Sequence, residues 1–121
     1  MPAATFGKRK RLLTSAEYGY VFDQASYKVS HQHYLVLART NSLGWARLGL
    51  VVAKKNSRLA TRRNRIKRVV RDTFRNQQQF LDSLDIIFMA RRGFDALLPA
   101  QQTQLLQEAW VRLAKKGGSG S

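Results

Sequence analysis

Apolar residues recur along the chain with the spacing of a helix in some stretches and of a strand in others. Thr14 is followed three residues later by Glu17, a capping box that marks the start of a helix. The apolar residues after Thr14 are spaced by three and four, as on one helical face: Tyr18, Val21, Phe22 and Ala25. We therefore predict a short first helix.

Three stretches have the pattern of strands. In residues 33–39 the apolar side chains alternate between two faces, with Tyr34, Val36 and Ala38 on one and Leu35 and Leu37 on the other. A turn cluster at residues 41–44 separates this stretch from a second apolar run at 45–53. Residues 84–90 form a third run of strand length.

Two longer helices complete the pattern. Residues from about 58 to 80 have helical spacing, Gly93 interrupts the chain after the third strand, and Pro99 suits the first turn of a final helix. The predicted order is α-β-β-α-β-α, with room for an extra short strand. This order predicts an α+β protein, a two-layer sandwich of one sheet with helices on it.

Length and composition narrow the organisation. The chain has 121 residues, enough for one domain. We expect residues 1–116 to form that domain, beginning with a basic arm, and residues 117–121 to be a flexible Gly/Ser tail. The chain has no cysteine, and no apolar run approaches the roughly 18 residues of a membrane-spanning helix. We therefore expect a cytoplasmic protein without disulfides.

The charge is strongly one-sided, with 22 Lys and Arg against 7 Asp and Glu, a net charge of +15. The stretch Lys54 to Arg75 alone holds ten Lys or Arg and one acidic residue, Asp72. At about 100° per residue, one arc of this helix is apolar and the opposite arc is cationic. A solvated helix face normally mixes charges of both signs, so this face favours a polyanion. A membrane helix would need its apolar arc for lipid, and here the core needs it.

The candidate nucleic-acid-contacting side chains lie on this helix and at two other basic patches. On the helix they are Arg62, Arg63, Asn64, Arg65, Lys67, Arg68, Arg71 and Arg75. The other basic contacts are Lys8, Arg9, Lys10, Arg11, Lys54 and Lys55. For the N-terminal arm, a solubilising role and an RNA contact remain open alternatives.

The sequence contains no arrangement of residues that resembles a catalytic site. There is no Ser-His-Asp set, no phosphate-binding loop and no zinc spacing. His31 and His33 could share a strand face, but without cysteine or clustered carboxylates they would make a poor metal site. We expect them to be exposed polar residues, and we predict neither a catalytic residue nor a metal ligand in the chain.

The basic helix resembles a known family. Residues 60–71 read Ala-Thr-Arg-Arg-Asn-Arg-Ile-Lys-Arg-Val-Val-Arg, which closely resembles the Arg-Asn-Arg signature of the protein subunit of bacterial ribonuclease P. The resemblance extends to Lys54-Lys55 upstream and to Phe74-Arg75 downstream. It also covers Glu17-Tyr18-x-x-Val21-Phe22 and the Arg91-Arg92-Gly93 that follows the third strand. It therefore runs from about residue 8 to residue 113.

The resemblance implies a fold and a function. The implied fold is an α/β sandwich shared with a domain of a ribosomal small-subunit protein, with a left-handed strand-helix-strand crossover where the general rule predicts a right-handed one. The implied function is to assist a catalytic RNA in removing the 5′ leader from precursor tRNA. The chain would then be part of an endoribonuclease without being catalytic alone. Mg²⁺ would be held mainly by the RNA, and no protein partner would be obligatory.

The resemblance also assigns roles to residues. The signature corresponds to Arg63, Asn64 and Arg65, which would meet the catalytic RNA. A separate cleft for the single-stranded leader would be lined by Tyr18, Phe22, Tyr34 and Val36, although the pattern alone is more typical of a core. A structural RNA-binding protein, such as a ribosomal one, is the main alternative. A helix-turn-helix DNA binder is disfavoured by the three strand-like runs.

Overall fold

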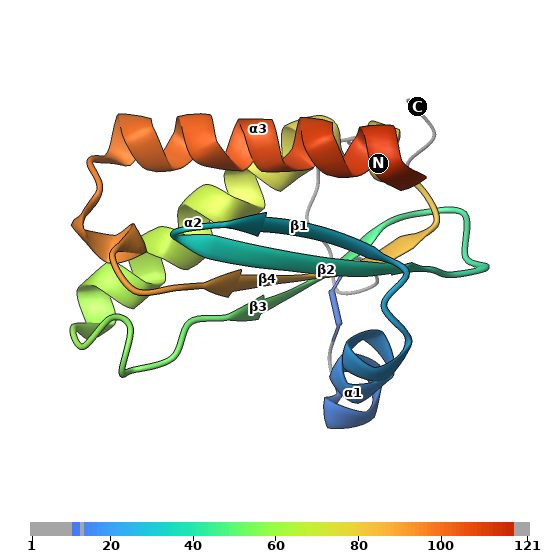
Figure 1. Cartoon of the computed structure of the whole chain (residues 1–121), viewed down its shortest axis with the longest axis horizontal. Helices are drawn as coiled ribbons and strands as arrows, with labels where there is room; N and C mark the ends of the chain where they lie inside the picture. Colours follow the sequence, from blue (N-terminus) through green and yellow to red (C-terminus); the bar gives the residue numbers. More distant parts are fainter. Residues whose placement is uncertain (1–10, 13, 118–121) are drawn as a thin grey trace.

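The computed structural model describes residues 11, 12 and 14–117, and its centre is a four-stranded sheet of order β1-β2-β4-β3 (Figure 1). The strands are β1 (Tyr27–His31), β2 (Tyr34–Thr40), β3 (Arg47–Val51) and β4 (Leu84–Ala90). The helices are α1 (Ser15–Gln24), α2 (Ala60–Gln77) and α3 (Pro99–Gly117). Two short 3₁₀ helices, Gln78–Leu81 and Phe94–Ala96, flank β4.

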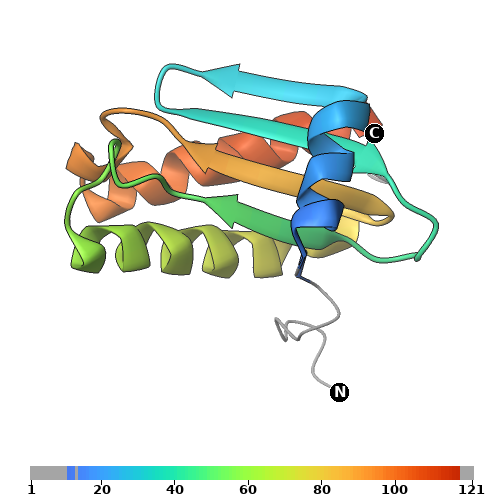
Figure 2. The same cartoon turned by 90° about the horizontal axis from the view of Figure 1, so that it is seen from below.

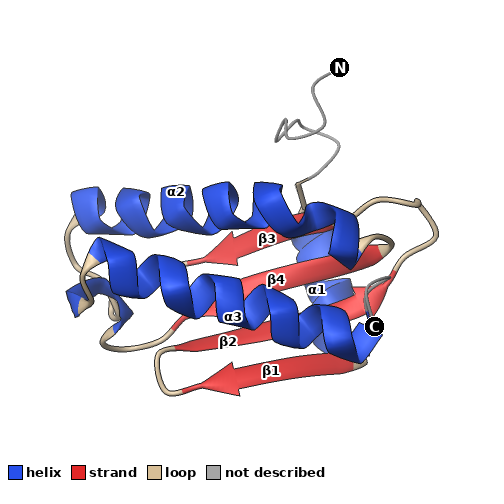
Figure 3. Ribbon diagram, turned by 90° about the horizontal axis from the view of Figure 1, so that it is seen from above, coloured by secondary structure: helices blue, strands red, loops and turns tan. Residues whose placement is uncertain are grey.

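The connection from β3 through α2 to β4 is unusual. β3 and β4 are neighbours and run parallel, whereas β2 pairs antiparallel with both β1 and β4. Viewed from the side of α2 and α3, with the two parallel strands pointing up, the chain passes from β3 to a β4 on its left (Figure 3). The crossover is therefore left-handed, as the family resemblance implied and against the general rule.

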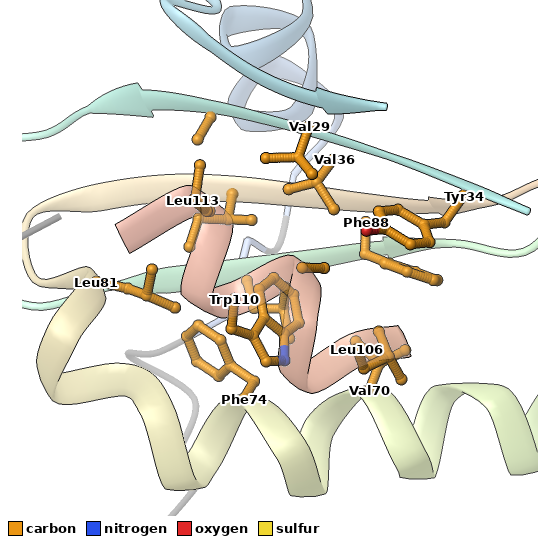
Figure 4. Packing of buried hydrophobic residues seen from close by; sticks show 14 of the residues in the cluster. Val29, Tyr34, Val36, Val70, Phe74, Leu81, Phe88, Leu106, Trp110 and Leu113 are labelled. Atoms are coloured by element: carbon orange, nitrogen blue, oxygen red, sulfur yellow. The ribbon is translucent and has the colours of Figure 1, made fainter. Parts of the chain in front are cut away.

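One face of the sheet is covered by α2 and α3 (Figure 3). Trp110 of α3 and Phe74 of α2 are fully buried and meet edge to face, with ring centroids 5.7 Å apart (Figure 4). The indole N–H of Trp110 donates to Thr73 Oγ1 at 3.0 Å, so the buried ring leaves no polar atom unsatisfied. This layer holds the larger of the two apolar clusters.

The other face carries α1, which crosses the strands near one end of the sheet (Figure 2). Tyr18 of α1 lies so close to Gly49 of β3 that a Cβ atom there would be 2.7 Å from the ring. The Tyr18 hydroxyl accepts a hydrogen bond from the backbone N–H of Leu50 at 3.1 Å. A smaller cluster beneath α1 buries Val21 against Ile87 of β4.

The predicted helix signals are present. The Thr14 hydroxyl accepts from the Glu17 N–H at 3.1 Å, and the Glu17 carboxylate accepts from the Thr14 N–H at 3.0 Å. Pro99 is the first residue of α3, and the extra short strand is β1. The predicted tail was wrong at its first position, because Gly117 still belongs to α3, where it lies close to the ring of Tyr27. Residues 118–121 lie outside the described residues.

Candidate nucleic-acid interface

The α1 face of the sheet consists of cross-strand rows. Leu37, Ile87 and Gly49 are partners across β2, β4 and β3 and form the row beneath α1. The next row is displaced by two residues along each strand and crosses all four strands: Ser30, Leu35, Met89 and Val51. The three apolar side chains of this second row are only half-buried. An apolar strip therefore remains accessible beside α1.

Two of the predicted cleft residues belong to the opposite face. Tyr34 and Val36 have exposed fractions of 1% and 0% and pack in the core beneath α3. Tyr34 lies near Phe88, with ring centroids 6.0 Å apart (Figure 4). Because side chains alternate along a strand, the apolar residues of β2 on the α1 side are Leu35 and Leu37. The alternation was predicted correctly, and the choice of which set meets α1 was wrong.

The two predicted aromatic residues of α1 differ in their surroundings. Phe22 is 44% exposed, although its neighbour Val21 is fully buried. Tyr18 is half-buried and hydrogen-bonded to β3 through its hydroxyl. Phe22 therefore offers an accessible aromatic ring on the helix that borders the apolar strip, whereas Tyr18 is partly committed to holding α1 on the sheet.

The basic helix packs as its period predicts. Ile66, Val70 and Phe74 are fully buried, whereas Asn64, Arg65 and Arg68 are exposed. In the described part of the chain, the acidic partners of α2 cations are Asp95, 3.7 Å from Arg62, and Asp72, 3.5 Å from Arg75. Arg65 and Arg68 belong to neither ion pair. Both guanidinium groups face solvent, and neither forms an ion pair with an acidic residue in the described part of the chain.

Two cations of α2 reach the α1 side of the molecule. Lys67 and Arg71 are half-buried and line a recess of about 210 Å³ at the β3 edge of the sheet. The remaining lining residues come from β3, from α1 and from the segment before α1: Arg11, Leu12, Tyr18, Leu48 and Leu50. Through this recess, two cations of α2 lie beside Tyr18 of α1.

Arg63, the first residue of the signature, points elsewhere. It is half-buried, and its Nη1 donates to the carbonyl oxygens of Ser57 and Arg58, both at 2.9 Å. Its half-burial agrees with a place at the edge of the apolar arc, and its contact with the catalytic RNA stays a prediction. Periodicity placed it at the margin of the apolar arc, and the loop before the helix supplies carbonyl acceptors at that margin.

The other predicted basic contacts fall into three groups. Arg11 forms an isolated parallel bridge with Leu48, so it lies beside β3. Lys54 and Lys55 are exposed in the loop between β3 and α2. The predicted contacts Lys8, Arg9 and Lys10 lie outside the described residues.

Three further arginines were missed as candidates. Arg91, just after β4, donates from Nη1 to Ser30 Oγ at 3.1 Å and to His31 O at 2.8 Å, which places it beside the Ser30 end of the apolar strip. Arg58 and Arg92 line a second recess of about 420 Å³ at the start of α2. The signal was present as Arg91-Arg92-Gly93, but one-dimensional spacing did not show that these residues return to the basic helix.

The two histidines are half-buried instead of exposed. His31 stacks on the Tyr34 ring with centroids 4.8 Å apart, and its Nδ1 accepts the backbone N–H of His33 at 3.0 Å. Burial, followed by the charges of His33 and Arg112, lowers the pKa of His31 below its usual 6.5. Nothing in the described ranges groups three or more His, Asp or Glu side chains as a metal would require.

The fold and this surface together define a class: a small α+β domain that presents a rigid cationic helix beside an accessible apolar strip. None of the helices in the described ranges is long and apolar enough to cross a membrane. The four-stranded sheet also excludes a simple helix-turn-helix domain.

Known proteins identify the family. The family model for ribonuclease P matches residues 6–114. The ribonuclease P protein component of Chromohalobacter salexigens is 51% identical over 110 residues, which cover 91% of this chain and 86% of that protein. The Pseudomonas aeruginosa component is 43% identical over 115 residues, covering 95% and 85%. This chain therefore belongs to the ribonuclease P protein family, the protein component of a tRNA-processing endoribonuclease.

Solved structures have the same fold. The Staphylococcus aureus RNase P protein superposes with a TM-score of 0.79 at 27% identity, covering 88% of this chain and 95% of that one. The Thermotoga maritima RNase P protein superposes with a TM-score of 0.75 at 26% identity, covering 91% and 100%. The α+β sandwich predicted from the sequence is confirmed by both.

Proposed function

We propose that this chain assists the catalytic RNA of ribonuclease P in removing the 5′ leader from precursor tRNA, by binding both the catalytic RNA and the single-stranded leader. The observation that carries the proposal is the proximity of two unlike surfaces. Lys67 and Arg71 of the cationic helix and Tyr18 of α1, the helix beside the apolar strip, line one recess. Such a pair suits one protein that holds two RNA segments side by side.

The exposed face of α2 suits the catalytic RNA. Arg65 and Arg68 are held in fixed positions because the opposite side of the helix is buried in the core. Guanidinium groups form forked contacts with phosphates, and such contacts tolerate any base sequence. Asn64 is exposed on the same side of the helix, and its amide can both donate to and accept from RNA, which arginine cannot.

The accessible strip beside α1 suits the leader. Leu35, Met89 and Val51 offer apolar surface, and Phe22 offers an accessible ring. Stacking and apolar contact with unpaired bases are tolerant of sequence, as an enzyme with many tRNA precursors requires. Lys67 and Arg71 would neutralise the backbone phosphates of a strand lying on this surface.

The hydrolysis itself would belong to the RNA. Mg²⁺ ions that activate water and stabilise the leaving oxygen would be held mainly by RNA phosphates. The cations of α2 would support such a site only indirectly, by holding the RNA segments in place. The holoenzyme would work in the cytoplasm, where precursor tRNA is processed.

Salt dependence tests the RNA contact. Arg68→Ala should weaken binding to a bacterial ribonuclease P RNA and lower the slope of log affinity against log salt by about one. Lys115→Ala, which removes an exposed charge from the far end of α3, is the matched control and should leave the slope unchanged. An unaltered slope in Arg68→Ala would remove the α2 face from the RNA interface.

Reconstitution tests the activity. Added to a bacterial ribonuclease P RNA at low Mg²⁺ concentration, the chain should restore cleavage of the 5′ leader from precursor tRNA. Failure to stimulate cleavage, with binding to the RNA intact, would reduce the protein to a structural RNA binder.

A further inference from the structure

The loop between β3 and α2 is held by two side chains that come from different places. Asn56, within the loop, donates from Nδ2 to the carbonyl oxygen of Ala90 at the end of β4, at 3.1 Å. Arg63, one turn into α2, donates to Ser57 O and Arg58 O, both at 2.9 Å. The first anchor ties the loop to the sheet and the second ties it to the helix.

The Arg63 side chain holds the loop through one end of its guanidinium. A single nitrogen, Nη1, serves two successive carbonyl oxygens, one of them in a partly buried setting. The two residues lie five and six positions before Arg63, so the side chain reaches back past the first residue of the helix. α2 has no side-chain cap at Leu59, and Arg63 is therefore the side chain that fixes how the loop enters the helix.

The loop carries part of the positive charge of the surface. Lys55 and Arg58 from the loop line the 420 Å³ recess together with Arg62 of α2 and Arg92 from the segment after β4. Asp95, at the same recess, is the acidic partner of Arg62. Because like charges repel, the loop cations would move apart if the loop were released. The two anchors oppose that movement.

We propose that Arg63 is a positioning residue for RNA binding: it acts through the loop, fixing Lys55 and Arg58 beside Arg92, whereas Arg65 and Arg68 contact RNA with their own side chains. The proposal rests on the proposed function in one respect, that the chain binds RNA. It divides the two arginines of the Arg-Asn-Arg signature between different tasks. Arg63 organises the neighbouring surface, and Arg65 belongs to the contact surface itself.

Double-mutant cycles on the full chain, with a bacterial ribonuclease P RNA as the probe, separate the two tasks. Arg63→Ala and Arg58→Ala should each weaken RNA binding severalfold. The double variant should bind RNA at least about threefold more tightly than the product of the two single effects predicts, because both substitutions remove the same loop contact. When Arg63→Ala is combined with Arg68→Ala, the two losses of RNA affinity should multiply. Asn56→Ala, which releases the other anchor, should couple to Arg58→Ala in the same direction.

Amide hydrogen exchange in the protein without RNA measures the stability of the loop itself, so a loss of direct RNA contacts does not change it. The backbone N–H groups of Asn56 and Ser57 both donate to Ala53 O, at 3.0 and 3.1 Å. Their exchange should accelerate in Arg63→Ala and stay unchanged in Arg68→Ala, with the thermal midpoint showing that both variants are folded.

The outcomes distinguish this proposal from the proposed function. Multiplicative effects for Arg63 with Arg58, together with unchanged loop exchange, would show that Arg63 contacts RNA directly and would overturn the inference. If the Arg58, Arg65 and Arg68 variants all bound RNA like the unaltered chain, the proposed function would fail, whatever the loop exchange showed.

Discussion

The two faces of the sheet are built from the same strands and differ in what covers them. Phe88 and Met89 are neighbours on β4, yet Phe88 is fully buried beneath α2 and α3, whereas Met89 is half-exposed beside α1. Both faces are apolar. The covered face supplies the stability of the fold, and the partly bare face has apolar surface to offer a partner. Apolar character alone therefore does not distinguish core from binding surface in this protein.

The largest effect should come from truncating one side chain on each face. Phe88→Ala removes a fully buried ring next to Phe94 and should lower the free energy of unfolding by about 3–5 kcal/mol. Met89→Ala should lower it by only about 1 kcal/mol, because its side chain is only partly buried. Urea unfolding of both variants would check this, and equal losses would contradict the assignment of the faces.

A pair of glycines tests how closely α1 is held on its face. A methyl group at Gly49 would lie 2.7 Å from Tyr18 Cε2, so Gly49→Ala should displace α1 and cost about 1–3 kcal/mol. Gly19, within α1, has no atom within 4 Å of such a methyl group. Gly19→Ala should instead stabilise the protein by about 0.5–1 kcal/mol. Thermal unfolding of both variants checks this. If Gly49→Ala left the stability unchanged, α1 would not be packed closely on β3.

Leader recognition should depend on the bare face and not on the covered one. Phe22→Ala should weaken binding of precursor tRNA roughly tenfold relative to mature tRNA, because one stacking contact is lost. Tyr20→Ala is the matched control, since Tyr20 is an exposed aromatic residue of the same helix whose ring lies under Arg39 instead. If the precursor were weakened no more than the mature tRNA, Phe22 would have only a structural role.

The smallest effect concerns the pH dependence of the covered face. Burial and the neighbouring His33 and Arg112 lower the pKa of His31, with Glu108 opposing them. Between that lowered value and 6.5 the unfolded chain binds more protons than the folded one, so stability is greatest above pH 6.5 and declines as the pH falls through this window. Between pH 7.5 and pH 5, the denaturation midpoint of His31→Gln should fall less than that of the unaltered chain. An identical loss would assign the acid sensitivity to other groups.

The features that the sequence predicted correctly are those set by neighbours along the chain. The capping box at Thr14, the start of α3 at Pro99 and the buried arc of α2 each depend on residues a few positions apart. β1 was harder to predict because Tyr27–His31 is short, lies at the sheet edge and has one fully buried residue, Val29. The family resemblance, and not periodicity, supplied the left-handed crossover.

The sequence by itself determined the helices and three of the strands, the alternation of β2 and the cationic face of α2, because each is a periodic property of one segment. Only the tertiary structure decided that Leu35 and Leu37, not Tyr34 and Val36, face α1, since alternation defines two sets of residues without saying which helix covers each. It also decided that Arg63 binds backbone carbonyls while Arg65 faces solvent, because hydrogen-bond partners come from the path of the loop and not from the period of the helix.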